Sequence, residues 1–169
     1  SSGVIGALGM HVERIANDAS IRFVVLRGAG KMFAAGADIA QMSNFREEDG
    51  QIFSKNGHHV FDAIENLPQV TFAALNGHAL GGGCEVALAC DFRIAVGSAK
   101  LGQPESRLGL VPGWGGTIRL PRLVGYANAK RLMFTGDSIS ADEALRIGLV
   151  DEVVPAASDL DAALKRWFE

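Results

Sequence analysis

Residues 76–85 have the sequence Asn-Gly-His-Ala-Leu-Gly-Gly-Gly-Cys-Glu. The apolar start of this run and its three consecutive glycines predict the end of a strand that turns directly into a helix. The free N–H groups at such a helix start, together with the helix dipole, would stabilise negative charge developing on a bound group. Glycine runs also form plain flexible turns, so this run alone leaves a binding role and a structural role open.

Strands and helices alternate on both sides of this run. The apolar patterns of residues 70–75 and 92–95 predict two strands, and the pattern of residues 86–90 between them predicts a buried helix. Such alternation indicates an α/β fold with right-handed crossover connections. The other expected elements are a buried strand over 21–28, a strand over 150–154, helices over 4–15, 44–66, 114–120, 127–134 and 160–168, and a helix capped mutually by Ser140 and Glu143.

Composition and charge restrict the possible partners. The chain has 169 residues, of which 48% are hydrophobic, enough for one sizeable core. Its 16 Lys and Arg against 19 Asp and Glu give a net charge of −3, which argues against nucleic acid as a partner. Arg119 and Arg122 are expected to be surface or interface charges rather than phosphate clamps. Because no apolar stretch reaches the roughly 18 residues of a membrane span, we expect a soluble, intracellular protein with no membrane partner.

Cysteine and histidine positions show no pattern typical of a metal site or a catalytic triad. Cys84 and Cys90 are too few for a disulfide framework, and no His or Cys pair accompanies them. His58, His59 and His78 have no recurring ligand spacing, and no serine occupies a nucleophile elbow. We therefore expect small core residues at the cysteines, structural or exposed histidines, and no bound metal.

Two further segments could bring the backbone close to a ligand. Residues 34–38, Ala-Ala-Gly-Ala-Asp, would either let a ligand lie against the main chain or form a tight turn under a helix, and these residues alone do not decide between the two. Residues 112–117, Pro-Gly-Trp-Gly-Gly-Thr, begin another helix but lack the Lys-Ser/Thr of a phosphate-binding loop. Neither this segment nor residues 76–85 fit the dinucleotide pattern G-x-G-x-x-G, so nucleotide phosphate binding of these kinds is disfavoured.

Two glutamates stand in unusual surroundings. Glu85 ends the glycine run, and Glu105 ends the box Gly102-Gln103-Pro104-Glu105. Taken alone, Glu85 would complement the dipole of a helix, and Glu105 would be a surface loop residue. Two carboxyls beside glycine-rich backbone suggest instead acid/base chemistry next to a bound carbonyl.

Four segments together resemble the enoyl-CoA hydratase/isomerase family, the crotonase superfamily. They are Ala-Ala-Gly-Ala-Asp-Ile at 34–39, the run at 76–85, Gly-Gln-Pro-Glu at 102–105 and Pro-Gly-x-Gly-Gly-Thr-x-Arg-Leu-Pro-Arg at 112–122. They follow the family's order and spacing, and the resemblance covers nearly the whole chain. It implies the family's spiral of repeated ββα turns in a single core domain over residues 1–169, without the first strand and hairpin and the C-terminal helical region that members usually have.

The resemblance also implies roles for individual residues. The N–H groups of Ala37 and Gly82 would form an oxyanion hole for the thioester carbonyl of an acyl-CoA. Glu85 would act as base toward a water and Glu105 as acid toward the α carbon of the substrate, with both carboxyls holding the same water. The N–H of Gly113 would help to fix that water. The other expected contacts to the acyl-CoA are Lys31, Ala35, Asp38, Ile39 and Ala40.

The resulting expectation is reversible syn hydration of a trans-2-enoyl-CoA to a 3-hydroxyacyl-CoA. The alternatives are an enoyl-CoA isomerase, which needs only one carboxylate, and a catalytically inactive acyl-CoA-binding member. No cofactor is expected, since coenzyme A is part of the substrate. The resemblance further implies lipid metabolism, a homotrimer or a dimer of trimers, and the cytoplasm of a bacterium or the mitochondrial matrix of a eukaryote. Phe45, Phe53, Val60 and Phe61 lie on the stretch expected to border the acyl tail.

Overall fold

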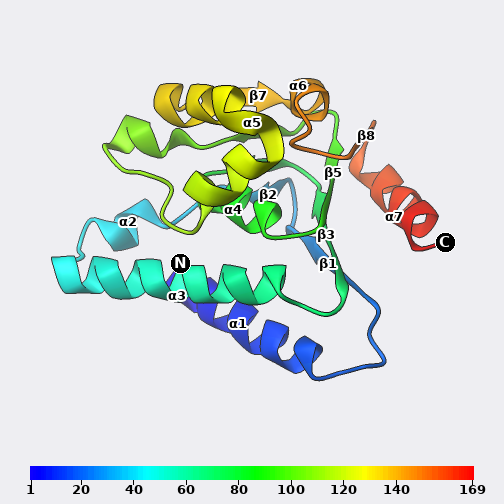
Figure 1. The fold of residues 1–169 in the computed structure, drawn as a ribbon, viewed down its shortest axis with the longest axis horizontal. Coiled ribbons are helices and arrows are strands. Elements are labelled where there is room, and N and C mark those ends of the chain that lie inside the picture. The colour runs from blue at the N-terminus through cyan, green and yellow to red at the C-terminus, as the bar shows by residue number, and fades with distance from the viewer.

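Eight strands form two four-stranded sheets in this computed structural model, which describes all of residues 1–169 (Figure 1). The strands are β1 (Phe23–Arg27), β2 (Met32–Ala34), β3 (Val70–Leu75), β4 (His78–Leu80), β5 (Phe92–Val96), β6 (Lys100–Gly102), β7 (Ser138–Ser140) and β8 (Glu152–Val154). The first sheet has the order β1-β3-β5-β8 and is parallel throughout. The second has the order β2-β4-β6-β7, in which only β7 runs antiparallel.

Helices surround the two sheets. They are α1 (Ser2–Ala16), α2 (Ile39–Met42), α3 (Glu47–Glu65), α4 (Gly82–Leu88), α5 (Gly116–Thr135), α6 (Ala141–Arg146), α7 (Leu160–Phe168) and the 3-10 helices η1 (Pro104–Leu108) and η2 (Ala157–Asp159). Helices α1 and α3 pack side by side, and the later turns of α5 lie on the opposite side of the molecule from them (Figure 1). None of these helices is both long enough and apolar enough to cross a bilayer.

Successive turns of the chain add one strand to each sheet and then a helix. The strands β1 and β2 precede α3, β3 and β4 precede α4, and β5 and β6 precede α5. Each turn stacks on the previous one by parallel pairing in both sheets. The expected spiral of ββα turns is therefore confirmed, and it places equivalent strand ends one above another.

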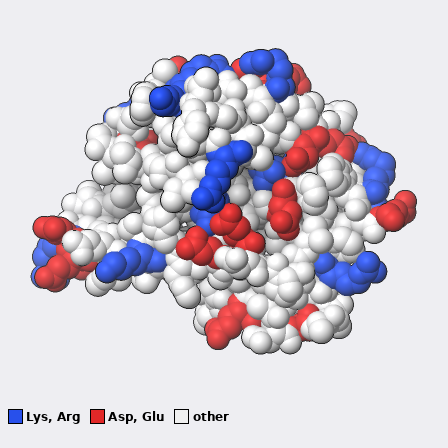
Figure 2. Space-filling view, in the orientation of Figure 1, with Lys and Arg blue, Asp and Glu red and all other residues white.

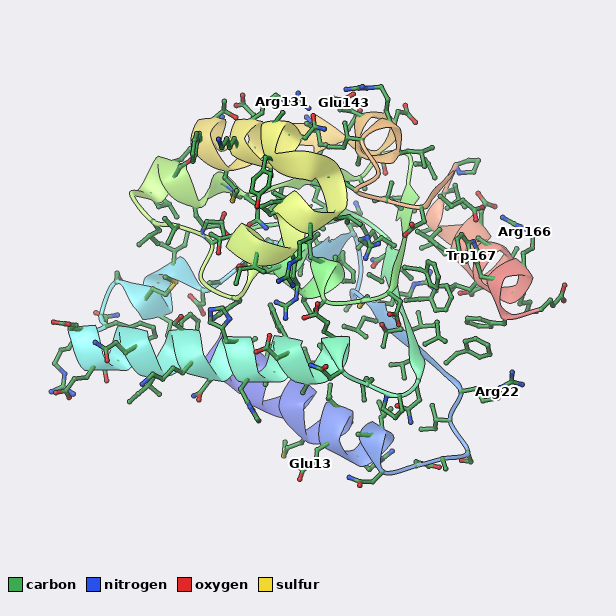
Figure 3. The ribbon with its side chains drawn as sticks, in the orientation of Figure 1. Glu13, Arg22, Arg131, Glu143, Arg166 and Trp167 are labelled. Atoms are coloured by element: carbon green, nitrogen blue, oxygen red, sulfur yellow. The ribbon has the colours of Figure 1, made fainter.

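The first sheet and its covering helix form much of the core. Residues 72–75 of β3 are at most 1% exposed, since β3 lies between two other strands. The ring of Phe168 in α7 stacks on Phe23 at a centroid distance of 4.6 Å and meets Phe72 edge-on at 5.3 Å. Helix α7 has the bounds expected from its amphipathic pattern, and the indole N–H of Trp167, which is labelled in Figure 3, donates to Glu152 at 2.7 Å.

Two expectations about single elements were wrong, and a third was confirmed with a shifted helix start. Strand β1 is not buried, because it forms the edge of its sheet, where Val25 is 39% exposed. The two helices expected at 114–120 and 127–134 are confirmed as the two parts of α5, which begins at Gly116 rather than Trp114 and breaks at Gly125, where φ is 76°. Ser140 does cap α6 by accepting a hydrogen bond from the N–H of Glu143, but the Glu143 carboxyl does not return it.

The Glu143 carboxyl instead pairs with two arginines. It accepts hydrogen bonds from Arg131 of α5 and Arg146 of α6, and Figure 3 shows Arg131 beside it. These two partners, Arg146 first, lower the pKa of Glu143 to about 2. On the face drawn in Figure 2, basic and acidic side chains likewise adjoin in several places, separated by large areas without charged residues.

Candidate active site

Three neighbouring strands of the second sheet end beside one another. Strands β2, β4 and β6 are parallel, with Ala34 opposite Ala79 and Leu80 opposite Gly102. The carboxyl ends of parallel strands meet at the same edge of a sheet, where α/β proteins commonly bind ligands. Consequently residues 35–38, 81–85 and 103–105, which follow these strands, converge.

The glycine run is required by close packing at this edge. The N–H of Gly81, which has a φ of 55°, donates to the carbonyl of Gly102 at 3.0 Å. A Cβ atom on Gly83 would lie 2.1 Å from the carbonyl oxygen of Ala34, so α4 begins in direct contact with β2. The run is therefore a rigid junction between strands rather than a flexible turn.

Two backbone N–H groups at this junction have no partner within the chain. Gly82 is the first residue of α4, whose first-turn N–H groups have no intrahelical acceptor, and the N–H of Ala37 donates to no other group of the chain. A Cβ atom on Gly36 would lie 3.7 Å from the nitrogen of Gly82. The segment that leads to Ala37 therefore lies against the Gly82 amide, and both residues line one cavity.

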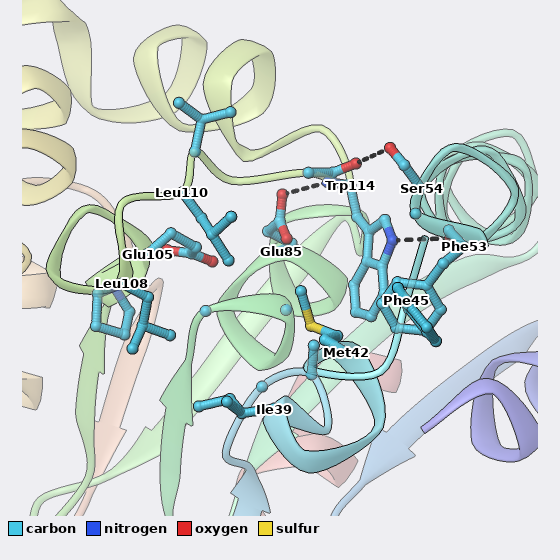
Figure 4. Close-up of a pocket in the computed structure, with 18 of the residues that line it drawn as sticks. Ile39, Met42, Phe45, Phe53, Ser54, Glu85, Glu105, Leu108, Leu110 and Trp114 are labelled. Atoms are coloured by element: carbon cyan, nitrogen blue, oxygen red, sulfur yellow. Dashed lines mark hydrogen bonds between the residues drawn. The ribbon is translucent and has the colours of Figure 1, made fainter. Parts of the chain in front are cut away.

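That cavity has a volume of about 290 Å³ and is mainly apolar (Figure 4). Most of the site residues expected from the sequence line it. These are Ala35, Ala37, Ile39, Gly82, Glu85, Glu105 and Gly113. The structure thus brings together two glutamates and two free amides from three separate segments of the chain.

Glu85 is held rigidly in the wall of the cavity. Its side chain is 2% exposed, and its Oε1 atom accepts hydrogen bonds from the N–H groups of Trp114 at 2.7 Å and Gly116 at 2.9 Å (Figure 4). Burial raises the pKa of Glu85, and the two N–H donors oppose this effect. The carboxyl is therefore bound by the segment that begins α5, and complementing the dipole of α4 is not its only role.

Glu105 occupies a different environment on η1. It is half-buried, and burial, followed by the charge of Glu85, raises its pKa to about 7. The fully buried amide of Gln103, with its nitrogen turned toward Glu105, donates to both carboxyl oxygens at 3.0 and 3.1 Å. The position of a Cβ atom on Gly81 lies 3.0 Å from Oε1 of Glu105, so this carboxyl lies close to the glycine junction. Two carboxyls with different environments on one cavity are typical of paired acid and base groups.

Trp114 forms an apolar wall that the sequence reasoning missed. It is 6% exposed, and its ring packs against Phe53 and Phe61 at centroid distances of 5.0 and 5.4 Å. Its indole N–H donates to the carbonyl of Phe53 at 3.3 Å. A Cβ atom on Gly57 or Gly82 would lie 2.1 or 2.4 Å from the indole, so both glycines make room for it. Trp114 occupies a variable position of the motif at 112–122, so the motif indicated no role for this residue.

Of the four residues expected to border the acyl tail, two line the cavity and two do not. Phe45 and Phe53 line the cavity, together with Met42, Leu108 and Leu110, which the sequence did not indicate. Val60 and Phe61 do not line it, because α3 turns them toward the core.

Three residues expected to contact acyl-CoA lie outside the cavity. Lys31 is exposed in the turn before β2, and Ala40 is exposed on α2. The side chain of Asp38 caps α2 by accepting a hydrogen bond from the N–H of Gln41 at 3.1 Å. Contacts of these residues to the outer part of a coenzyme A molecule stay predictions.

The cysteines and histidines have other surroundings. Cys84 and Cys90 are buried free thiols, as expected, and burial raises the pKa of each to about 12. His78 accepts a hydrogen bond from the N–H of Lys100 at 3.0 Å. No group of three or more His, Cys, Asp or Glu side chains is arranged to hold a metal ion.

Comparison with known proteins decides the family. The family model described as enoyl-CoA hydratase/isomerase matches residues 2–169. The chain belongs to this family. The enoyl-CoA hydratase/isomerase fold is also that of a solved enoyl-CoA hydratase from Bacillus anthracis, with a TM-score of 0.94 and 43% identity, over 99% of this chain and 65% of that one.

Two curated members of the enoyl-CoA hydratase/isomerase family are about half identical to the chain. The short-chain-enoyl-CoA hydratase of Clostridium acetobutylicum is 50% identical over 153 residues, which cover 90% of this chain and 59% of the relative. The crotonyl-CoA hydratase of Syntrophomonas wolfei is 52% identical over 144 residues, which cover 85% and 55%. The chain thus spans less than two thirds of the length of these relatives.

Proposed function

We propose that this chain carries the active site of an enoyl-CoA hydratase, which adds water reversibly and syn to a trans-2-enoyl-CoA. The observation that carries the proposal is the pair Glu85 and Glu105 on one cavity whose wall also presents the free N–H groups of Ala37 and Gly82. The names of the two relatives, a short-chain-enoyl-CoA hydratase and a crotonyl-CoA hydratase, support the same reaction.

Binding of the thioester prepares the substrate for attack. The carbonyl oxygen accepts hydrogen bonds from the N–H groups of Ala37 and Gly82, which strengthen as negative charge develops on this oxygen in the enolate. Each such donor contributes on the order of 3 kcal/mol to stabilisation of a transition state. Because the donors are backbone groups on small residues, the thioester can approach the main chain closely.

The two carboxyls divide the proton transfers between them. Ionised Glu85 takes a proton from a water, held also by the N–H of Gly113, as the oxygen of that water bonds to the β carbon. Protonated Glu105 gives its proton to the α carbon. The pair then carries the same number of protons as before, but on the other carboxyl, and transfer of this proton from Glu85 to Glu105 through the next bound water restores the starting state. Both groups act from the same side of the double bond, and this produces syn addition.

Further parts of the proposal extend beyond the cavity. We propose an acyl-CoA thioester as the binding partner, no cofactor besides its coenzyme A, and a homotrimer or dimer of trimers for the intact protein. Residues 1–169 would act as a single domain within it. The reaction drawn above uses only carboxyls, backbone amides and water, so it needs no metal.

Crotonyl-CoA tests the proposed reaction. The intact protein is expected to remove the absorbance of the conjugated enoyl thioester and to form 3-hydroxybutyryl-CoA. In D₂O, the product should carry one deuterium at the α carbon, placed by syn addition. Unchanged absorbance at high protein concentration would contradict hydration and favour an inactive acyl-CoA-binding protein, whereas double-bond migration in a 3-enoyl-CoA without hydration would favour an isomerase.

The pH dependence of the reaction follows from the raised pKa of Glu105. Hydration requires a proton on Glu105, so kcat/KM should fall as the pH rises through about 7. Because the overall reaction neither consumes nor releases a proton, dehydration should show the same alkaline limb. The rate profile measured for hydration tests this, and the absence of an alkaline limb near pH 7 would contradict the assignment of the proton to this pair.

A further inference from the structure

A buried arginine lies behind the segment that binds Glu85. Arg119 of α5 is 7% exposed and does not line the cavity, so the expectation of a surface charge is wrong for it. Its Nη1 donates to the carbonyl of Trp114 at 3.0 Å, and its Nε donates to Glu65 of α3 at 2.9 Å. Its Nη2 bonds Asp62 and Glu65, also on α3. The guanidinium therefore joins the end of α3 to the turn at 113–116.

The contacts of this turn alternate between Glu85 on one side and side chains of α3 and α5 on the other. The N–H of Trp114 donates to Glu85, while the carbonyl of Gly113, in the same planar peptide group, accepts a hydrogen bond from Ser54 at 3.0 Å (Figure 4). The carbonyl of Trp114, in the next peptide group, accepts the bond from Arg119. The carbonyl groups of Gly113 and Trp114 are therefore held by the side chains of Ser54 and Arg119, and neither of these side chains bonds to Glu85.

Packing leaves the turn little freedom around the guanidinium. Gly115 has a φ of 103°, and a Cβ atom there would lie 2.0 Å from Nη1 of Arg119. The backbone of Gly115 is thus in close contact with the guanidinium of Arg119. Any movement of Arg119 would displace the neighbouring N–H groups of Trp114 and Gly116, which are the two donors to Oε1 of Glu85.

A buried ion pair is an uncertain source of stability, since apolar residues of similar volume often stabilise a fold as well or better. Arg119 therefore calls for another explanation. We propose that Arg119 is a positioning residue for Glu85, which fixes the turn at 113–116 so that Oε1 is bound and Oε2 is free to act on water. This inference rests on the proposed hydratase function.

Electrostatics act in the same direction. The titratable and charged groups that face Glu85 are His58 of α3, Arg119 of α5 and Glu105 of η1, and of these His58 and then Arg119 lower the pKa of Glu85 against the effect of burial. Removal of the arginine would weaken the N–H contacts and remove the cation. Both changes favour the protonated form of Glu85, which cannot accept a proton from water.

The test compares Arg119→Gln and Arg119→Lys with Arg122→Gln in the intact protein. Arg122 lies on the same helix, is exposed, and its side chain has no hydrogen bond or ion pair within the chain, so it is a matched control. In Arg119→Gln we expect kcat to fall by up to about 100-fold with KM nearly unchanged, because a displacement near 1 Å can have this effect. The acid limb of kcat/KM should move to higher pH. Arg119→Lys should return the acid limb of kcat/KM to its wild-type pH and should recover part of kcat. Arg122→Gln should match the wild type in both quantities.

A solely structural role for Arg119 predicts another outcome. The melting temperature of Arg119→Gln would fall, while kcat and the pH profile of the folded protein stayed those of the wild type, and this would overturn the inference. If Arg119→Gln does not fold, Arg119→Lys provides the test, since it keeps the charge but cannot reach all three partners; an unchanged kcat there would also overturn it.

A measurement independent of turnover separates this inference from the proposed function. The amide resonances of Trp114 and Gly116 in NMR spectra report the hydrogen bonds to Glu85 whether or not hydration occurs. We expect both resonances to shift in the Arg119 variants and to stay in place in Arg122→Gln. Absence of hydration by the wild type would refute the proposed function, whereas unmoved resonances in folded Arg119→Gln would refute the positioning role.

Discussion

Glu105→Gln abolishes measurable hydration of a trans-2-enoyl-CoA and leaves binding of the thioester nearly unchanged; this is the largest effect on activity that we expect. The amide cannot supply the proton that the α carbon receives, and a positioned acid or base group typically contributes about 10²- to 10⁴-fold to a rate. The substitution keeps the size of the side chain, so the cavity and the free N–H groups of Ala37 and Gly82 are preserved. Stopped-flow hydration rates and calorimetric titration with a non-reactive acyl-CoA measure the two quantities separately.

Glu143→Gln is the matched control for this substitution. Glu143 has its own ion pairs on α6, far along the chain from the cavity residues and absent from the cavity lining. Its replacement should leave the hydration rate unchanged. Wild-type turnover by Glu105→Gln would remove this carboxyl from the mechanism, and an equal loss of thioester binding would show that it acts in binding instead.

Gly83→Ala should cause the largest loss of stability. The added Cβ would lie 2.1 Å from the carbonyl oxygen of Ala34 and 2.7 Å from its carbonyl carbon, and backbone of a paired strand cannot move aside as a flexible side chain can. Overpacking of a core usually costs about 1–3 kcal/mol, and a clash with backbone lies at or above the upper end of this range. Urea unfolding monitored by circular dichroism measures the free energy of unfolding.

Gly6→Ala is the control for added volume at a helical glycine. A Cβ atom on Gly6 of α1 would meet no other atom within 4 Å. Because alanine favours the helix over glycine, this variant should be more stable by up to about 1 kcal/mol. Equal stability of Gly83→Ala and the wild type would contradict the close junction between α4 and β2.

Long periodic elements could be predicted from the sequence, whereas the second sheet could not. The pattern gave β3 and α7 with their observed bounds. Strands β2, β4, β6 and β7 have three residues each, too short for an alternating pattern to develop. The convergence of the site depends on the register of three of these strands, so only the resemblance of the motifs to a family placed Glu85, Glu105, Ala37 and Gly82 together.

Residues that support the site were harder to predict than those assigned to the chemistry. Trp114 occupies a variable motif position, and its role follows from space that Gly57 and Gly82 leave for it. Arg119 was expected to be a surface or interface charge. Arginine is rarely buried without partners, and the partners of Arg119, which are Asp62 and Glu65, lie more than fifty residues earlier in the chain. Such contacts follow from tertiary packing, which single-sequence patterns do not encode.

A crystal structure of the Glu105→Gln variant with crotonyl-CoA tests the proposed arrangement most directly. The variant should hold the substrate without converting it. We expect the thioester oxygen at about 3 Å from the nitrogens of both Ala37 and Gly82, with the side chains at positions 85 and 105 on the same face of the Cα–Cβ double bond. A thioester oxygen bound away from these two amides, or side chains at the two positions on opposite faces of the double bond, would contradict the account.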